Sequence, residues 1–178
     1  MKIKNKKLLK LIFAALFAAV LAVTSQIAIP TPLLVPITLQ TFIIALGGYL
    51  FGTTTTLSGV MVYITLGAIG LPVFSGFRGG AQVLFSATGG FIIGFLILAA
   101  ACGLSLRLKR DILKIALSLL GLLLCHLCGT AVFSIVTNTP FFEAFMVSSL
   151  LFLIKDIILV ILAVFISKKI KQRFCPVF

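Results

Sequence analysis

Long apolar runs separated by short polar breaks dominate the hydrophobic pattern of this 178-residue chain. A helix that crosses a bilayer needs about 20 mainly apolar residues, with a range of roughly 17 to 25. The runs therefore predict six spans, at about residues 8–29, 38–51, 55–71, 82–106, 112–136 and 141–166. A transmembrane β-barrel would instead alternate in polarity over short segments. We therefore expect an all-α bundle of six transmembrane helices that forms a single membrane domain over residues 1–178.

The composition agrees with this pattern. Hydrophobic residues make up 61% of the chain and charged residues 10%. A soluble domain has about 45–50% apolar and about 25% charged residues, so the apolar excess here must face lipid. The sequence therefore predicts an integral membrane protein.

The basic residues indicate the orientation of the spans. Thirteen of the fifteen cations lie at the N-terminus, in the connection at residues 107–114, or after the last apolar run. With six spans all three regions fall on one side, and cytoplasmic loops carry the excess of Lys and Arg. We therefore expect cytoplasmic termini in the cell membrane and no nucleic-acid partner. A cleaved signal peptide is the alternative interpretation of the basic, apolar start.

Two charged residues, Lys155 and Asp156, lie near the middle of the sixth predicted span. A charge at the bilayer centre costs at least about 2.5–3.5 kcal/mol, so such residues are candidates for a functional site. Adjacent helical residues point about 100° apart, so we do not expect these two to face each other. The alternative is that buried partners neutralise each charge.

The predicted outer connections, at about residues 30–37 and 72–81, are rich in proline and glycine. Irregular backbone near lipid is tolerated where protein or water satisfies its polar groups, so these connections are candidate pocket walls or ordinary connectors. In the first span, Ala14, Ala18 and Ala22 share one helical face. Small residues at this spacing predict either docking of a partner helix or packing within the bundle.

Motifs for catalysis are not found in the sequence. The chain lacks the glycine-rich, lysine-containing P-loop pattern, and no Ser, Cys or His has an evident set of catalytic partners. His126 lies between Cys125 and Cys128, but a metal site needs more ligands at compatible spacing. We expect no enzymatic activity, no cofactor and no metal.

Three segments carry a resemblance to a known family: Val35–Phe42 (VPITLQTF), Gly67–Phe74 (GAIGLPVF) with Gly79 and Gly80 beyond it, and Thr88–Phe91 (TGGF). Together they resemble the BioY family, the biotin-specific S components of energy-coupling-factor transporters. The resemblance covers about residues 8–167. It implies a six-helix bundle that holds biotin, as a transported ligand, near the outer face. It also implies partners, namely a membrane coupling protein bound to two ATPase subunits, with Ala14, Ala18 and Ala22 as the docking face.

The resemblance also suggests the binding residues. Biotin has a ureido ring with two N–H donors and a tail that ends in a carboxylate. Asp156 is expected to accept from the ureido N–H groups, and Arg78 or Lys155 to face the tail, because Arg suits bidentate pairing with carboxylates. The motifs add Thr38, Gln40, Gly79 and Gly80 as candidate contacts. The family often has Gly-Asp-x-x-Lys on this helix, and here Lys155 and Leu159 stand at the glycine and lysine positions.

Other functions remain open at this point. One is an S component for a different small vitamin. Another is a stand-alone secondary carrier, which would need inverted repeats, broken helices and ion sites. The single mid-membrane acid, Asp156, counts against a carrier. A structural or assembly protein is the third alternative, and it leaves Asp156 without a role.

Overall fold

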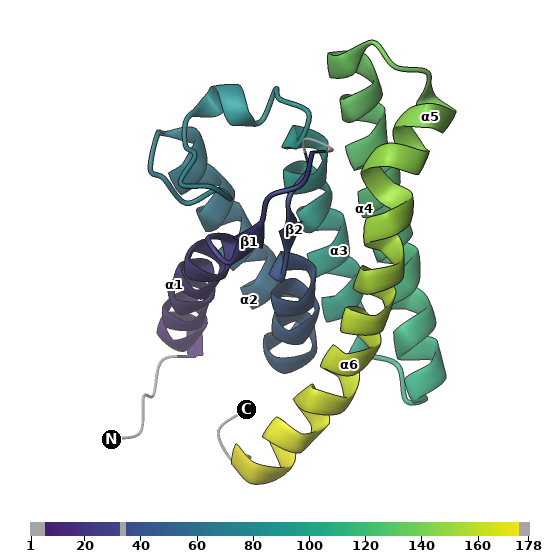
Figure 1. Ribbon diagram of the computed structural model, residues 1–178. Helices are drawn as coiled ribbons and strands as arrows, with labels where there is room; N and C mark the ends of the chain where they lie inside the picture. The colour runs from purple at the N-terminus through teal and green to yellow at the C-terminus, as the bar shows by residue number, and fades with distance from the viewer. Residues whose placement is uncertain (1–5, 33–34, 175–178) are drawn as a thin grey trace.

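The computed structural model describes residues 6–32 and 35–174, and these are mostly helical (Figure 1). Lys2 and Lys4 of the predicted basic N-terminus lie outside the described residues. Within the described ranges, four helical stretches are long and apolar enough to cross a bilayer: α1 (Lys6–Ser25), α2 (Gln40–Ala68), α4 (Asp111–Thr137) and the continuous stretch Phe141–Arg173. The apolar helix α3 (Gly89–Ser105) is shorter.

Large apolar side chains cover much of the outer surface of these helices. In α1, Leu11 and Leu16 are 67% and 56% exposed, and only 28% of the residues in its most apolar 18-residue segment are buried. Such a continuous apolar surface is costly in water and favourable in lipid. The prediction of a helical membrane protein is therefore confirmed.

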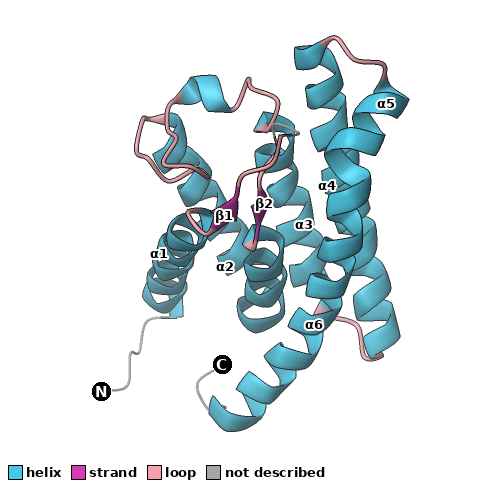
Figure 2. Ribbon diagram, in the orientation of Figure 1, coloured by secondary structure: helices cyan, strands magenta, loops and turns pink. Residues whose placement is uncertain are grey.

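A two-stranded ribbon follows α1 and is the one β-sheet among the described residues (Figure 2). The strands β1 (Ala28–Ile29) and β2 (Ile37–Thr38) pair antiparallel, with Ala28 opposite Thr38. The predicted first and second spans, 8–29 and 38–51, are therefore too long by a few residues at this junction. The ribbon forms because α1 ends at Ser25 and the chain turns back to enter α2 at Gln40.

The chain reverses direction within α2, at Gly52. Gly52 has φ +77° and ψ 178°, which is outside the helical region and is readily adopted by glycine. The Nε2 atom of Gln40 donates to the Oη atom of Tyr63 at 2.8 Å. In a straight helix these 23 residues would span about 34 Å, so the two arms of α2 must fold back on each other. The break expected at Gly52 is present, whereas the threonines after it are helical.

The predicted start of the fourth span, at residue 82, is wrong, because α3 begins at Gly89. Between α2 and α3 the chain forms turns and a short 3-10 helix, η1 (Ala81–Val83). A Cβ atom on Gly89 would collide with the Leu84 carbonyl, so glycine permits this tight turn into α3. This long connection is mostly irregular and lies at one end of the bundle (Figure 2).

The last helical stretch changes its winding near its start. It consists of α5 (Phe141–Phe145), the π-helical turn η2 (Met146–Leu150) and α6 (Leu151–Phe174). The start of α1, the α3–α4 turn and the end of α6 lie at the opposite end from the α2–α3 connection (Figure 1). At this end Lys168 of α6 pairs with Asp111 of α4. The predicted basic regions that are described therefore lie together.

Glycines allow α2, α3 and α4 to approach closely. A Cβ atom on Gly48 would lie 3.0 Å from the Gly103 nitrogen, and one on Gly103 would overlap the backbone of Thr53. A Cβ atom on Gly94 of α3 would lie 2.9 Å from the Cys125 carbonyl oxygen of α4. Small residues at such crossings are typical of helix packing in lipid. This packing fixes the three helices around the cavity described next.

Candidate binding cavity

A cavity opens at the end of the bundle that holds the β-ribbon and the α2–α3 connection. Its walls come from the segment before α2, both arms of α2, the connection, α3, α4 and α6. The lining residues are Val35, Pro36, Thr38, Gln40, Thr41, Tyr63, Phe74, Ser75, Arg78, Thr88, Phe91, Ile92, Phe95, Cys125, His126, Phe152, Lys155 and Asp156. Five of the predicted binding residues are therefore brought together: Asp156, Arg78, Lys155, Thr38 and Gln40.

One end of the cavity is built around the Asp156 carboxylate, which is 3% exposed. Its Oδ1 atom accepts from Thr41 Oγ1 at 2.5 Å and pairs with Lys155 Nζ at 2.8 Å. Its Oδ2 atom has a single partner among the described residues, His126 Nε2, at the long distance of 3.3 Å. A carboxylate oxygen has two lone pairs, so Oδ2 retains capacity for a further donor.

Lys155 pairs with Asp156, which corrects the expectation that these neighbours do not face each other. The lysine side chain is long enough to bend back along the helix, and its Nζ atom also donates to the Thr38 carbonyl at 2.7 Å. This second contact links α6 to β2. The Asp156 carboxylate is therefore buried at the cavity, and the Lys155 ammonium that neutralises it is held beside it by the Thr38 carbonyl.

His126 is a site residue that the sequence reasoning missed. It is 2% exposed, and its Nε2 atom must donate if it pairs with the Asp156 carboxylate. Its Nδ1 atom is buried and has no partner among the described residues. Phe91 packs edge-on against the imidazole, with ring centroids 5.7 Å apart. A lone His on an apolar helix gives no sequence signal for a partner 30 residues away.

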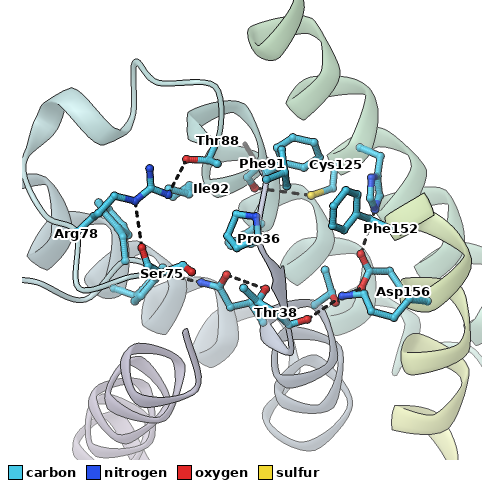
Figure 3. Close-up of a pocket in the computed structure, with 18 residues that line it drawn as sticks. Pro36, Thr38, Ser75, Arg78, Thr88, Phe91, Ile92, Cys125, Phe152 and Asp156 are labelled. Atoms are coloured by element: carbon cyan, nitrogen blue, oxygen red, sulfur yellow. Dashed lines mark hydrogen bonds and ion pairs between the residues drawn. The ribbon is translucent and has the colours of Figure 1, made fainter. Parts of the chain in front are cut away.

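The other end of the cavity carries Arg78, on the connection between α2 and α3. Its Nε atom donates to the Ser75 carbonyl at 3.1 Å, and its guanidinium reaches Thr88 Oγ1 at 3.4 Å. Figure 3 shows Arg78 and Asp156 on opposite sides of the cavity. No salt bridge to Arg78 is found among the described residues. The guanidinium is therefore available to an anionic group of a ligand.

The walls between these two ends are largely apolar and aromatic. They are formed by Phe74, Phe91, Phe95 and Phe152, together with Ile92. Phe91 and Phe152 lie between the two charged ends in Figure 3. A ligand that fits has a hydrogen-bonding head, an apolar middle and an anionic tail.

Of the remaining predicted contacts, Gln40 lines the cavity, and Gly79 and Gly80 lie in the connection beside it. Gln40 uses its amide to bond Tyr63, and its Oε1 atom accepts from Thr38 Oγ1 at 3.0 Å. Gly79 and Gly80 do not line the cavity. The Gly80 N–H donates to the Gly67 carbonyl at 2.7 Å, and a Cβ atom on Gly79 would lie close to the Leu71 carbonyl. The two glycines shape the connection, and their role as ligand contacts stays a prediction.

The predicted docking alanines lie on a largely buried face of α1. Ala14 and Ala18 are 4% and 3% exposed, and Ala22 is half-buried. A Cβ atom on Gly59 would lie 2.9 Å from the Ala14 carbonyl oxygen, so this face of α1 packs on α2. Ala14 and Ala18 therefore pack within the bundle, as the alternative interpretation had it, and a docking role for the three alanines stays a prediction.

The fold and the cavity define a helical membrane protein with a cavity lined by charged and aromatic side chains at one end of its bundle. Its sequence matches the BioY family over residues 1–175, and the chain belongs to that family. A biotin transporter BioY from Thermotoga maritima is 35% identical over 164 residues, covering 92% of this chain and 96% of that protein. A probable biotin transporter BioY from Pyrococcus horikoshii is 35% identical over 157 residues, covering 88% and 93%.

A solved structure agrees with the family membership. It is the crystal structure of the S-component for biotin from an ECF-type ABC transporter, with a TM-score of 0.85 and 27% identity. The match covers 97% of this chain and 95% of that chain. The resemblance stated from the three sequence segments is therefore confirmed, and the expectation that this chain is not an enzyme agrees with a transporter family.

Proposed function

We propose that this protein captures biotin as the S component of an energy-coupling-factor importer. The observation that carries the proposal is the separation of the buried Asp156 carboxylate from the Arg78 guanidinium by aromatic walls. Biotin has the matching order of groups: a ureido head with two N–H donors, an apolar ring and chain, and a carboxylate. The ureido N–H would donate to Asp156 Oδ2, and the carboxylate would pair with Arg78.

Binding of labelled biotin to the purified protein in detergent tests this function. We expect saturable binding of one biotin per chain, and displacement by unlabelled biotin but not by thiamine or riboflavin. Saturable binding of labelled thiamine or riboflavin, with none of labelled biotin, would indicate an S component of different specificity. Saturable binding of none of them would contradict the proposal.

The topology and partners belong to the same proposal. Counting the two arms of α2 separately, the chain would cross the cell membrane six times as a single domain over residues 1–178. The end with Lys168 and the α3–α4 turn would be cytoplasmic, because basic ends are retained on that side. The cavity would then open to the outside. A coupling protein and two ATPase subunits would supply the energy for import.

Docking to the coupling protein would use the exposed face of α1. Ala15 and Ala19 are exposed on this helix and are one turn apart, which allows a second helix to approach closely. We expect Ala19→Trp to reduce biotin uptake by about tenfold or more, equivalent to about 1.4 kcal/mol of lost association, while biotin binding is unchanged. Uptake in cells and binding by the purified variant measure the two effects.

Ala18→Trp is the matched variant on the buried face of the same helix. Because Ala18 is 3% exposed, a large ring there should lower the yield of folded protein in addition to biotin uptake. Normal uptake by Ala19→Trp at normal expression would remove this face of α1 as the docking surface.

A further inference from the structure

The end of α1 is attached to the connection that carries Arg78. The Oε1 atom of Gln26 accepts from the Phe77 N–H at 2.9 Å. Its Nε2 atom lies 3.2 Å from the Phe74 carbonyl oxygen and 3.4 Å from that of Pro72, and shares its two hydrogens with acceptors on α1. The Gln26 amide therefore bonds backbone groups both before and within the turn that ends at Arg78.

This turn is a tight hairpin. Phe74 and Arg78 exchange two backbone hydrogen bonds, of 3.0 and 3.2 Å, around a loop of three residues. Gly76 and Phe77 both have positive φ angles, +73° and +56°. A positive φ is uncommon for a residue such as Phe and persists only where surrounding contacts impose it. Phe77 is 73% exposed, so its side chain does not anchor the residue in the core.

Gln26 supplies a contact of this kind to the hairpin. Its bond to the Phe77 N–H fixes the peptide group one residue before Arg78. Ser25 adds a second link, because its Oγ atom donates to the Val73 carbonyl at 2.5 Å. The backbone of Arg78 is thereby held, and its guanidinium is directed to Ser75 and Thr88 at the cavity.

We propose that Gln26 is a positioning residue for recognition of the ligand's carboxylate, and that it acts through Arg78. The inference rests on the proposed function, because it takes biotin as the ligand and Arg78 as the partner of its tail. Gln26 is not among the cavity-lining residues, so its effect on binding must be indirect.

The test compares biotin with biotin methyl ester, which lacks the tail charge. We expect the wild type to prefer biotin by about tenfold, as for a charge-assisted hydrogen bond at a partly exposed site. Gln26→Met retains the length of the side chain and removes its hydrogen bonds. This variant should reduce the preference for biotin over the ester to about threefold or less. The loss should come from a lower affinity for biotin, with the affinity for the ester unchanged.

A double-mutant cycle and a control make the result specific. Arg78→Met should remove the preference for biotin over the ester. The double variant Gln26→Met, Arg78→Met should bind biotin with the same affinity as Arg78→Met alone. Thr24→Val is the matched control, because the partners of the Thr24 hydroxyl among the described residues are carbonyls of its own helix. It should leave both affinities unchanged.

Three outcomes would overturn the inference. An equal loss of affinity for biotin and for the ester in Gln26→Met would indicate a general structural role. An unchanged preference for biotin would show that Arg78 does not depend on Gln26 for its position. A wild type that binds neither ligand would overturn the proposed function and this inference with it. Gln26→Asn, which retains an amide but is one methylene shorter, gives a second measurement with the same expected loss of preference and an unchanged polarity of the side chain.

Discussion

Asp156→Asn should weaken biotin binding by roughly 10- to 150-fold, equivalent to the 1.5–3 kcal/mol of a hydrogen bond to a charged group. The carboxylate is 3% exposed, and its Oδ2 atom has capacity for a ligand donor. An amide at this position also leaves Lys155 without its anion, 2.8 Å away in the wild type. Calorimetric titration of the purified variant with biotin measures the loss.

Glu143→Gln is the matched control for this substitution. Glu143 is exposed in the first turn of α5 and does not line the cavity. The same change from carboxylate to amide should leave the affinity for biotin within about twofold of the wild type, as expected for a surface substitution. Comparable losses in both variants, or none in Asp156→Asn, would exclude a specific role for Asp156.

Gly103→Leu should prevent stable folding, and it is the substitution with the largest expected effect on stability. Gly103 of α3 is buried where α3 meets the turn of α2, and a Cβ atom there would overlap the backbone of Thr53. Overpacking typically costs 1–3 kcal/mol, and a collision with backbone that cannot rotate away should exceed about 4 kcal/mol. Thermal unfolding in detergent, followed by size-exclusion chromatography, measures the loss.

Ala116→Leu provides the comparison for this prediction. Ala116 is exposed on α4, so a larger apolar side chain there faces lipid. Its melting temperature should stay close to that of the wild type. A stable, monodisperse Gly103→Leu protein would show that α2 and α3 do not cross as closely as the structure places them.

Much of the helical arrangement could be predicted from the sequence, because lipid-facing helices must be apolar over a fixed length. The bounds of α4 agree with the predicted span within one residue at each end. The start of α3 could not be predicted, because residues 82–88 are also rich in apolar side chains. The turn there depends on contact between Gly89 and the Leu84 carbonyl, which hydropathy does not report.

The binding site could be predicted only in part. Asp156 was identified because a charge within a membrane is costly unless it has partners. The partners themselves were not predicted, because His126 and Thr41 reach Asp156 from other helices. A helical-wheel argument also fails for Lys155, because its long side chain bends toward its neighbour.

The alanine face of α1 shows a different limit of sequence reasoning. Spacing of four places Ala14 and Ala18 on one face, and Ala15 and Ala19 on another. Both faces satisfy the rule for close helix approach. Only the tertiary contact of Ala14 with Gly59 shows which face packs internally and which is exposed.

A structure of the protein with biotin bound tests the central claim most directly. It should show biotin inside the cavity, with a ureido nitrogen about 3 Å from the Asp156 carboxylate and the tail carboxylate beside the Arg78 guanidinium. Biotin bound in the reverse direction, or outside the residues that line this cavity, would contradict the account.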